Sequence, residues 1–207
     1  MFGVWPMVLS QTLKYKLVGG DMNTIGKRIK YLPATNDPLS ADVYCVEGNE
    51  YCYIYDVGNN ENSLHYINQL GKEKVVILSH YHKDHTGNIE EIHYHNLYVG
   101  KKTHEVIGKG IIVEDKFTIN DGVRIDVIHC ISPHTDGSLI ITVDNEYTLI
   151  ADLYFTRPPF DKDKAMKMIE SLRDIDTKYF VISHQEEEKV IPKETLIQEL
   201  TEYFCKA

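Results

Sequence analysis

A short stretch, residues 80–85, concentrates the metal-binding chemistry of this sequence. It is the run His80-Tyr81-His82-Lys83-Asp84-His85. The pattern H-x-H-x-D-H places three imidazoles and one carboxylate close together, an arrangement that is costly unless a cation lies among them. Imidazole and carboxylate are ligands that suit zinc and similar divalent cations. The segment therefore predicts a metal site.

Other candidate ligands stand where predicted strands end. Four polar residues end or follow apolar runs: Asp56, His80, Asp152 and His184. A side chain at the end of a buried strand is held rigidly and still reaches solvent, which is what a metal ligand needs. One more candidate, His134, lies in the segment 132–138.

Together, five histidines and two aspartates could enclose two divalent ions: His80, His82, Asp84, His85, His134, Asp152 and His184. The set contains no cysteine, whereas a closed structural zinc site would typically use thiolates, so we interpret it as an open catalytic site. Two neighbouring cations lower the pKa of a shared water enough to give hydroxide near neutral pH. Asp84 could bind metal, orient that nucleophile and pass on its proton.

The elements that must position these residues can be predicted from periodicity. Strands are predicted by β-branched and apolar runs at 43–46, 51–57, 74–79, 97–99, 123–129, 139–143, 147–151 and 179–183. Helical spacing predicts helices at 63–70, 163–173 and 193–204. Asn88 with Glu91 fits a helix capping box. The order of these elements favours an α/β fold with two sheets and outer helices.

The length of 207 residues predicts a single domain, 1–207, with residues 1–30 as an N-terminal extension of unassigned role. Within it, the apolar start at 2–9 is interpreted as an edge strand or a dimer contact, so a homodimer is a hypothesis. The formal net charge of −9 disfavours nucleic acid as a partner. No stretch has the length of a transmembrane helix, so we expect a cytoplasmic protein without a membrane partner and with a small-molecule substrate.

The four cysteines are Cys45, Cys52, Cys130 and Cys205. They show neither C-x-x-C spacing nor the density of a disulfide scaffold, so buried or idle thiols are the favoured interpretation. A hairpin around Gly48 would place Cys45 and Cys52 nearly opposite each other, so a cross-strand disulfide bond is an alternative.

From Asp42 to about Gln185, the order and spacing of the candidate ligands resemble the metallo-β-lactamase superfamily. The resemblance implies a four-layer αββα sandwich and two Zn²⁺ ions, with Fe or Mn as other candidates. By position, His80, His82 and His134 would hold the first metal, and Asp84, His85 and His184 the second. Asp152 would bridge them, and Asp56 in Asp56-Val57-Gly58 would support the metal loop from behind the ligands.

The chain departs from the superfamily pattern at several glycines. Asn88 follows Gly87 where a second glycine is usual, Pro133 precedes His134, and the last histidine is flanked by Ser183 and Gln185. Glycine allows a close approach of the backbone. These departures leave every candidate ligand in place and change the chain around them.

The segments 127–129 and 151–155 look most like glyoxalase II, so the resemblance implies a zinc-dependent hydrolase with a thioester as the first substrate and a lactone as the second. Tyr154 is either a donor to a substrate oxyanion or a packing residue. Two alternatives stay open. One is a mononuclear non-heme iron oxygenase of the persulfide dioxygenase type, and the other is a metal-binding protein without turnover.

Overall fold

The computed structural model describes residues 15–17, 20–154, 159–185 and 188–206. The predicted edge strand or dimer contact at 2–9 lies outside the described residues. None of the helices in the described part of the chain has the length and hydropathy that crossing a membrane requires.

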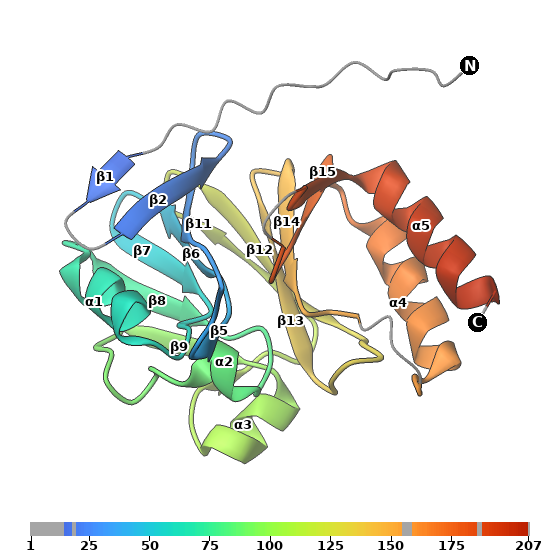
Figure 1. Cartoon of the computed structure of the whole chain (residues 1–207), viewed down its shortest axis with the longest axis horizontal. Helices are drawn as coiled ribbons and strands as arrows, with labels where there is room; N and C mark the ends of the chain where they lie inside the picture. Colours follow the sequence, from blue (N-terminus) through green and yellow to red (C-terminus); the bar gives the residue numbers. More distant parts are fainter. Residues whose placement is uncertain (1–14, 18–19, 155–158, 186–187, 207) are drawn as a thin grey trace.

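Two sheets form the centre of the molecule (Figure 1). The first sheet has the strand order β1-β2-β3-β6-β7-β8-β9-β10. Its strands are β1 (Tyr15–Leu17), β2 (Gly20–Ile25), β3 (Ile29–Leu32), β6 (Val43–Glu47), β7 (Tyr51–Tyr55), β8 (Glu73–Ile77), β9 (Asn96–Val99) and β10 (Ile111–Ile112).

The second sheet has the order β11-β12-β13-β14-β15-β16. Its strands are β11 (Lys116–Asn120), β12 (Arg124–Cys130), β13 (Ser138–Val143), β14 (Tyr147–Ala151), β15 (Tyr179–Ile182) and β16 (Val190–Pro192). A separate small ladder joins β4 (Thr35–Asn36) to β5 (Leu39–Ser40).

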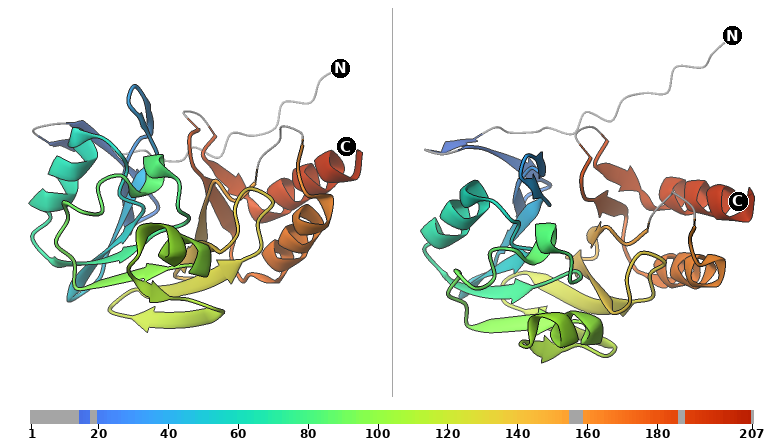
Figure 2. Two further views of the ribbon diagram at one scale, coloured as in Figure 1. Left: turned by 90° about the horizontal axis from the view of Figure 1, so that it is seen from below. Right: turned by 60° about the horizontal axis from the view of Figure 1, so that its bottom comes forward.

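The helices are α1 (Glu61–Gln69), α2 (Lys83–Thr86), α3 (Lys101–Ile107), α4 (Lys162–Asp174) and α5 (Lys193–Lys206). Helix α1 lies on the outer face of the first sheet, and α4 and α5 lie side by side on the outer face of the second (Figures 1 and 2). The predicted αββα sandwich is therefore confirmed.

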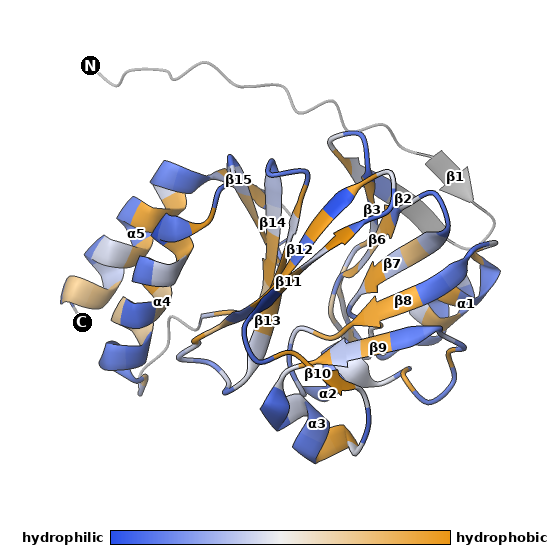
Figure 3. Ribbon diagram, turned by 180° about the vertical axis from the view of Figure 1, so that it is seen from behind, coloured by the Kyte–Doolittle hydropathy of each residue, from blue (hydrophilic) through white to orange (hydrophobic). Residues whose placement is uncertain are grey.

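Apolar residues fill the three spaces between these four layers. The cluster between the sheets includes Tyr55, Ile77, Ile125 and Leu139, all almost fully buried. Apolar residues occupy the central parts of the strands, whereas many of the loops and parts of the outer helices are hydrophilic (Figure 3). Burial of this apolar surface is the main favourable contribution to the stability of such a fold.

Helices α1 and α4 have the apolar helical spacing that the sequence predicts, and each begins with a side-chain cap. Asp161 accepts a hydrogen bond from the backbone N–H of Lys164 and so caps α4, and Asn60 caps α1 in the same way. The face of α4 that packs on the second sheet comprises Ala165, Met168, Ile169 and Leu172. This spacing of three and four residues is the helical period.

All eight predicted strand runs and all three predicted helices overlap elements of the structure. The capping box is wrong: Asn88 lies in a turn, and its side-chain amide donates to the backbone carbonyls of Val57 and Asn60 at 3.0 Å each. The side chain of Asn88 therefore ties the turn to the chain that follows β7, instead of starting a helix.

The predicted hairpin of β6 and β7 is present, with a register that differs from the expected one. Cys52 pairs with Glu47 and Cys45 with Ile54, so the two cysteines are diagonal neighbours rather than opposite ones. Their sulfur atoms are 2.8 Å apart, and both residues are free, buried thiols.

One feature of the topology positions the candidate site. Each sheet contains neighbouring parallel strands, β7 beside β8 in the first sheet and β14 beside β15 in the second. The carboxyl ends of parallel strands meet at one edge of a sheet, and loops at that edge commonly carry functional residues. Three residues there have left-handed backbone conformations: Asp56 (φ 59°), Ala151 (φ 45°) and His184 (φ 57°).

Hydrogen bonds join the two sheets at the same edge. The buried hydroxyl of Tyr55 donates to the carbonyl of Leu139 at 2.8 Å, and the backbone N–H of Leu139 donates to the carbonyl of Ser79 at 2.7 Å. These bonds hold the end of β8 against the start of β13, so the two edges are fixed relative to each other.

Candidate metal centre

The structure brings all seven candidate ligands together in two adjacent groups. The first contains His80, His82 and His134, and the second contains Asp84, His85, Asp152 and His184. Within each group, one nitrogen or oxygen atom from every residue lies within 4.8 Å of the others. Because four of these residues follow β8 and three come from the second sheet, each group is shared between the sheets.

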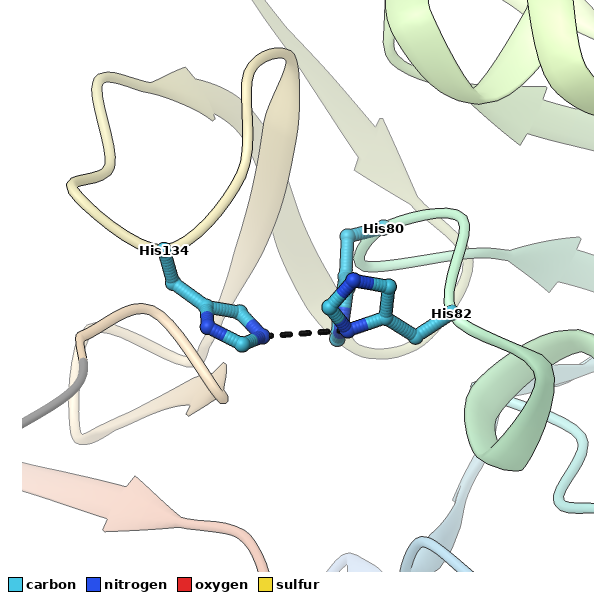
Figure 4. Close-up of side chains that lie close together, drawn as sticks. All are labelled: His80, His82 and His134. Atoms are coloured by element: carbon cyan, nitrogen blue, oxygen red, sulfur yellow. Dashed lines mark hydrogen bonds between the residues drawn. The ribbon is translucent and has the colours of Figure 1, made fainter.

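The first group consists of three imidazoles that face one another (Figure 4). Nε2 of His134 lies 3.1 Å from Nδ1 of His82, and the ring centre of His80 is 4.6 Å from that of His82 and 5.2 Å from that of His134. Burial and the neighbouring imidazoles lower the pKa of all three histidines. The rings are therefore neutral, and neutral imidazole is the form that binds a metal ion.

The second group combines two carboxylates with two imidazoles. Nε2 of His184 lies 3.2 Å from Oδ2 of Asp84, and Nε2 of His85 lies 3.3 Å from Oδ2 of Asp152. Burial by itself would raise the pKa of both carboxyl groups, but the neighbouring histidines lower it. Both aspartates are therefore ionised.

The short helix α2 presents Asp84 and His85 to the second group. His82 is its N-cap residue, and the N–H groups of His85 and Thr86 donate to the carbonyl of His82 at 3.0 and 3.1 Å. The carbonyl of Asp84 accepts from the N–H of Ala41, and that of His85 accepts from the N–H of Val57, both at 2.9 Å. These backbone bonds fix the segment 80–85 in place.

Behind the ligands, the carboxylate of Asp56 fixes the tautomers of two histidines. It accepts hydrogen bonds from the backbone N–H and the hydroxyl of Ser79, both at 2.7 Å, and lies 2.7 Å from Nδ1 of His85. The hydroxyl of Ser79 has only one hydrogen, which Asp56 accepts, so Nδ1 of His80 at 2.9 Å must donate to the Ser79 oxygen. His80 and His85 therefore both direct Nε2 toward the site.

These two nitrogen atoms test whether the residues fit a metal ion. Nε2 of His80 is a buried side-chain atom without a hydrogen-bond partner in the described structure, and Nε2 of His85 is buried with only the carboxylates of Asp152 and Asp84 beside it, at 3.3 and 3.5 Å. A buried polar atom without a partner is costly, and such atoms are rare in folded proteins. A divalent cation would give each nitrogen a partner and would neutralise the carboxylates, so the donor set fits zinc or a similar metal.

Without such a cation, a proton takes its place at His85. Burial opposes charging of this imidazole, but the carboxylates of Asp56 and Asp152 outweigh that effect and raise the pKa of His85 to about 10. The pKa of His184 is also raised, first by its contact with Asp84. The second group therefore attracts positive charge.

The loop that carries His134 is held by Ser132. The Ser132 hydroxyl donates to the carbonyl of Leu153 at 2.6 Å and accepts from the N–H groups of His134 and Thr135. The same loop also approaches Gly100 closely, because a Cβ atom on Gly100 would lie only 1.7 Å from the carbonyl oxygen of Gly137. The position of His134 thus depends on a close backbone contact with the start of α3.

Tyr154 and two further histidines, His65 and His104, make contacts outside the two groups of candidate ligands. Tyr154 packs against the apolar cluster between the second sheet and helices α4 and α5, which supports its interpretation as a packing residue. His65 contacts Gln69, and Nδ1 of His104 lies 3.0 Å from the carbonyl of Gly110.

Two sets of side chains that support the candidate ligands were not predicted from the sequence. Ser79, directly before His80, orients that ring, and its place beside the motif was the available signal. Asp42 and Lys189 form a buried ion pair at 2.9 Å beside His184. They lie 147 residues apart in the chain, so no local pattern could join them.

The model of the metallo-beta-lactamase superfamily matches residues 36–106 of this chain. A comparison with curated protein sequences finds no match. Among solved structures, the chain is similar to an archaeal metallo-beta-lactamase superfamily protein from Sulfolobus tokodaii, with 19% identity, a TM-score of 0.66, and 86% of each chain covered.

A metallo-beta-lactamase from Pontibacter korlensis is similar at 13% identity and a TM-score of 0.66, over 95% of this chain and 100% of that one. A B3 metallo-beta-lactamase with an active-site glutamic acid is similar at 10% identity and a TM-score of 0.64, over 91% of this chain and 86% of that one. At these identities, the likeness shows the fold.

Proposed function

We propose that this chain, which has the metallo-β-lactamase fold and matches that superfamily's model over residues 36–106, is a metal-dependent hydrolase of a small ester-like substrate. One observation carries the proposal. Side chains from both sheets converge on one edge of the sandwich, where the buried Nε2 of His80 has no hydrogen-bond partner and the buried Nε2 of His85 faces only carboxylates.

In the proposed enzyme, the two groups of residues would hold two divalent cations. His80, His82 and His134 would hold one, and Asp84, His85 and His184 the other. Asp152 would contact both, and its charge already affects the pKa of His80 and His134 as well as that of His85. When bound, such cations polarise a carbonyl oxygen and lower the pKa of water, which is the chemistry that the proposed hydrolysis needs.

The chain's own residues would supply positioning and proton transfer. Asp84 is ionised and only partly buried, so its carboxylate can accept a proton from an attacking water and later release it to the leaving group. Asp56 and Ser79 keep the rings of His80 and His85 in one orientation. Because every ligand follows a strand or lies in a hydrogen-bonded loop, little rearrangement would accompany binding.

The proposed substrate class is a small molecule with an ester-like carbonyl group, a thioester first and a lactone second. The motive is the resemblance of segments 127–129 and 151–155 to glyoxalase II. We rank β-lactams lower, although two of the similar structures are named as metallo-beta-lactamases, because true β-lactamases usually have Cys or Ser where this chain has Asp152.

The test is hydrolysis by the zinc-loaded protein across a panel of thioesters, lactones, β-lactams and phosphodiesters. We expect turnover of a thioester or lactone, and its loss in Asp84→Ala. Turnover that survives in Asp84→Ala would contradict the proposed role of this residue. If no substrate of the panel is hydrolysed although two equivalents of metal are bound, the result would favour a metal-binding protein without turnover.

The iron oxygenase alternative predicts a different metal content. It needs a single iron ion held by two histidines and one aspartate. The structure supplies a second group of four ligand residues beside the three histidines, which supports two ions rather than one. Elemental analysis of the purified protein separates these cases, because the oxygenase would contain one equivalent of iron.

A further inference from the structure

The loop that carries His184 is attached to the first sheet by the buried side chain of Asp42. Asp42 precedes β6, whereas His184 follows β15 in the second sheet. The Asp42 carboxylate accepts from the backbone N–H of His184 at 2.9 Å, from the hydroxyl of Ser183 at 2.9 Å, and from the N–H of Ala34 at 3.1 Å. One carboxylate thus holds both the conformation and the position of this loop.

Lys189, at the other end of the same loop, balances the charge of Asp42. Its Nζ donates to both carboxylate oxygens of Asp42 at 2.9 Å, and the side chains are 7% and 0% exposed, respectively. The N–H of Ile182 also donates to the carbonyl of Lys189 at 3.1 Å, so the end of β15 lies beside the start of β16. A buried ion pair of this kind contributes little net stability but fixes one arrangement of the chain.

The backbone of His184 explains why such a contact is needed. His184 has a left-handed conformation, with φ 57°, although it has a Cβ atom and its neighbours are Ser183 and Gln185 rather than glycine. For a residue other than glycine this conformation is strained and persists only where surrounding contacts hold it. The hydrogen bond from the His184 N–H to Asp42 is such a contact.

We propose that Asp42, neutralised by Lys189, is a positioning residue that controls metal binding by the group of Asp84, His85, Asp152 and His184. This inference rests on the proposed function, because it requires that group to bind a metal ion. It assigns no such role to Asp42 at the three-histidine group, whose residues lie in the loops after β8 and β12. Loss of Asp42 should therefore weaken binding of one metal equivalent out of two.

The experiment uses paired substitutions, since removal of one partner would leave a buried charge. Asp42→Leu with Lys189→Met removes both charges and the hydrogen-bond acceptor. Asp42→Asn with Lys189→Met removes both charges and keeps an oxygen that can accept from the His184 N–H. Asp126→Leu is the matched control, because Asp126 is a buried carboxylate that contacts Thr118, Lys116 and Arg124 in the second sheet.

The readouts are zinc content after dialysis, the affinity of each equivalent by competition with a chromophoric chelator, and the visible spectrum of the cobalt-loaded protein. Circular dichroism establishes that each variant is folded. For Asp42→Leu/Lys189→Met, we expect the second equivalent to bind about 10- to 100-fold more weakly, the typical effect of losing a group that orients a ligand. We expect the first equivalent to bind this variant with wild-type affinity. Asp42→Asn/Lys189→Met should regain most of the affinity for the second equivalent. Asp126→Leu should bind both equivalents with wild-type affinity.

Two unchanged equivalents in Asp42→Leu/Lys189→Met would overturn the inference and leave the proposed function intact. A wild-type protein that binds fewer than two equivalents would overturn both, so the two failures are distinguishable. If the leucine variant does not fold, Ser183→Ala replaces it, because that change removes one donor to the same Asp42 oxygen and retains both charges. A several-fold loss of affinity for the second equivalent then supports the inference, and unchanged affinity overturns it.

Discussion

The carboxylate of Asp56 lies 2.7 Å from Nδ1 of His85, and both side chains are buried at the end of the first sheet. This contact determines which nitrogen of His85 faces the candidate site. The same carboxylate reaches His80 through the hydroxyl of Ser79, so one residue orients a ligand in each group. Asp56 is therefore more central to the site than its place outside the ligand set implies.

The first prediction concerns Asp56→Asn. The amide has no net charge and can present its NH₂ group to His85, so the orientation and basicity of that ring should be less well defined. We expect metal affinity to fall about 10- to 100-fold. Competition with a chromophoric chelator measures it. Asp121→Asn, which changes a hydrogen-bonded aspartate at the turn between β11 and β12, is the control, and an equal loss in both variants would contradict the prediction.

The second prediction concerns Asp84→Asn and turnover of whichever substrate is identified. The amide cannot accept a proton from water, and general acid–base catalysis typically contributes about 10²- to 10⁴-fold. We expect kcat to fall by that range when zinc is saturating. Asp163→Asn, an exposed position in the first turn of α4, should leave kcat unchanged. A kcat within about 10-fold of wild type for Asp84→Asn would argue against proton transfer at this residue.

The third prediction concerns the pH dependence of stability without metal. The pKa of His85 is about 10 in the folded protein, whereas it is about 6.5 in an unfolded chain. Because the folded pKa is raised, the stabilisation is fully present below about pH 6.5 and is lost as the pH rises toward 10. The Tm of the metal-free protein should therefore fall between about pH 6.5 and 9.

Thermal unfolding monitored by circular dichroism measures this dependence. The variant His85→Gln has no proton to lose at this position, so its Tm should vary less over the same window. Zinc should also flatten the profile of the wild type, because the cation takes the place of the proton on Nε2. A metal-free wild type whose Tm rises across this window would refute the prediction.

The fourth prediction concerns Gly100→Ala. A Cβ atom at this position would lie 1.7 Å from the carbonyl oxygen of Gly137, which is backbone and cannot rotate away. The loop 131–138 must then shift, and His134 with it. We expect a lower Tm and weaker binding at the three-histidine group. Gly71→Ala is a matched control, because a Cβ atom there would meet nothing within 4 Å. Equal Tm values for the two variants would contradict the argument.

The elements that the sequence predicts best are those with strong periodicity and full burial. Strand β13 is buried at every position, and α4 buries residues three and four apart, so their apolar patterns are unmistakable. Strand β11 was missed because its residues alternate between exposed and partly buried at a sheet edge. Strand β2 was missed because its sequence is mainly polar.

The residues of the site differ in the same way, because some are close in the sequence and others are brought together only by the fold. The spacing within 80–85 indicated a metal site directly, since its ligands are close in the chain. The buried pair of Asp42 and Lys189 was not predictable, because a lysine near the end of a sheet is ordinarily a solvated residue. Only the fold brings Lys189 beside Asp42 and makes its charge part of the site.

Each group of candidate ligands takes members from both halves of the chain, before β10 and after β11. A metal ion bound to either group would therefore hold residues 1–112 and the second half of the chain together, in addition to the peptide chain that joins them. Its binding energy would add to the association of the halves, and neither half alone would bind it with full affinity. Two fragments divided between β10 and β11 should thus associate more tightly with zinc than without it, so that assembly itself reports metal binding.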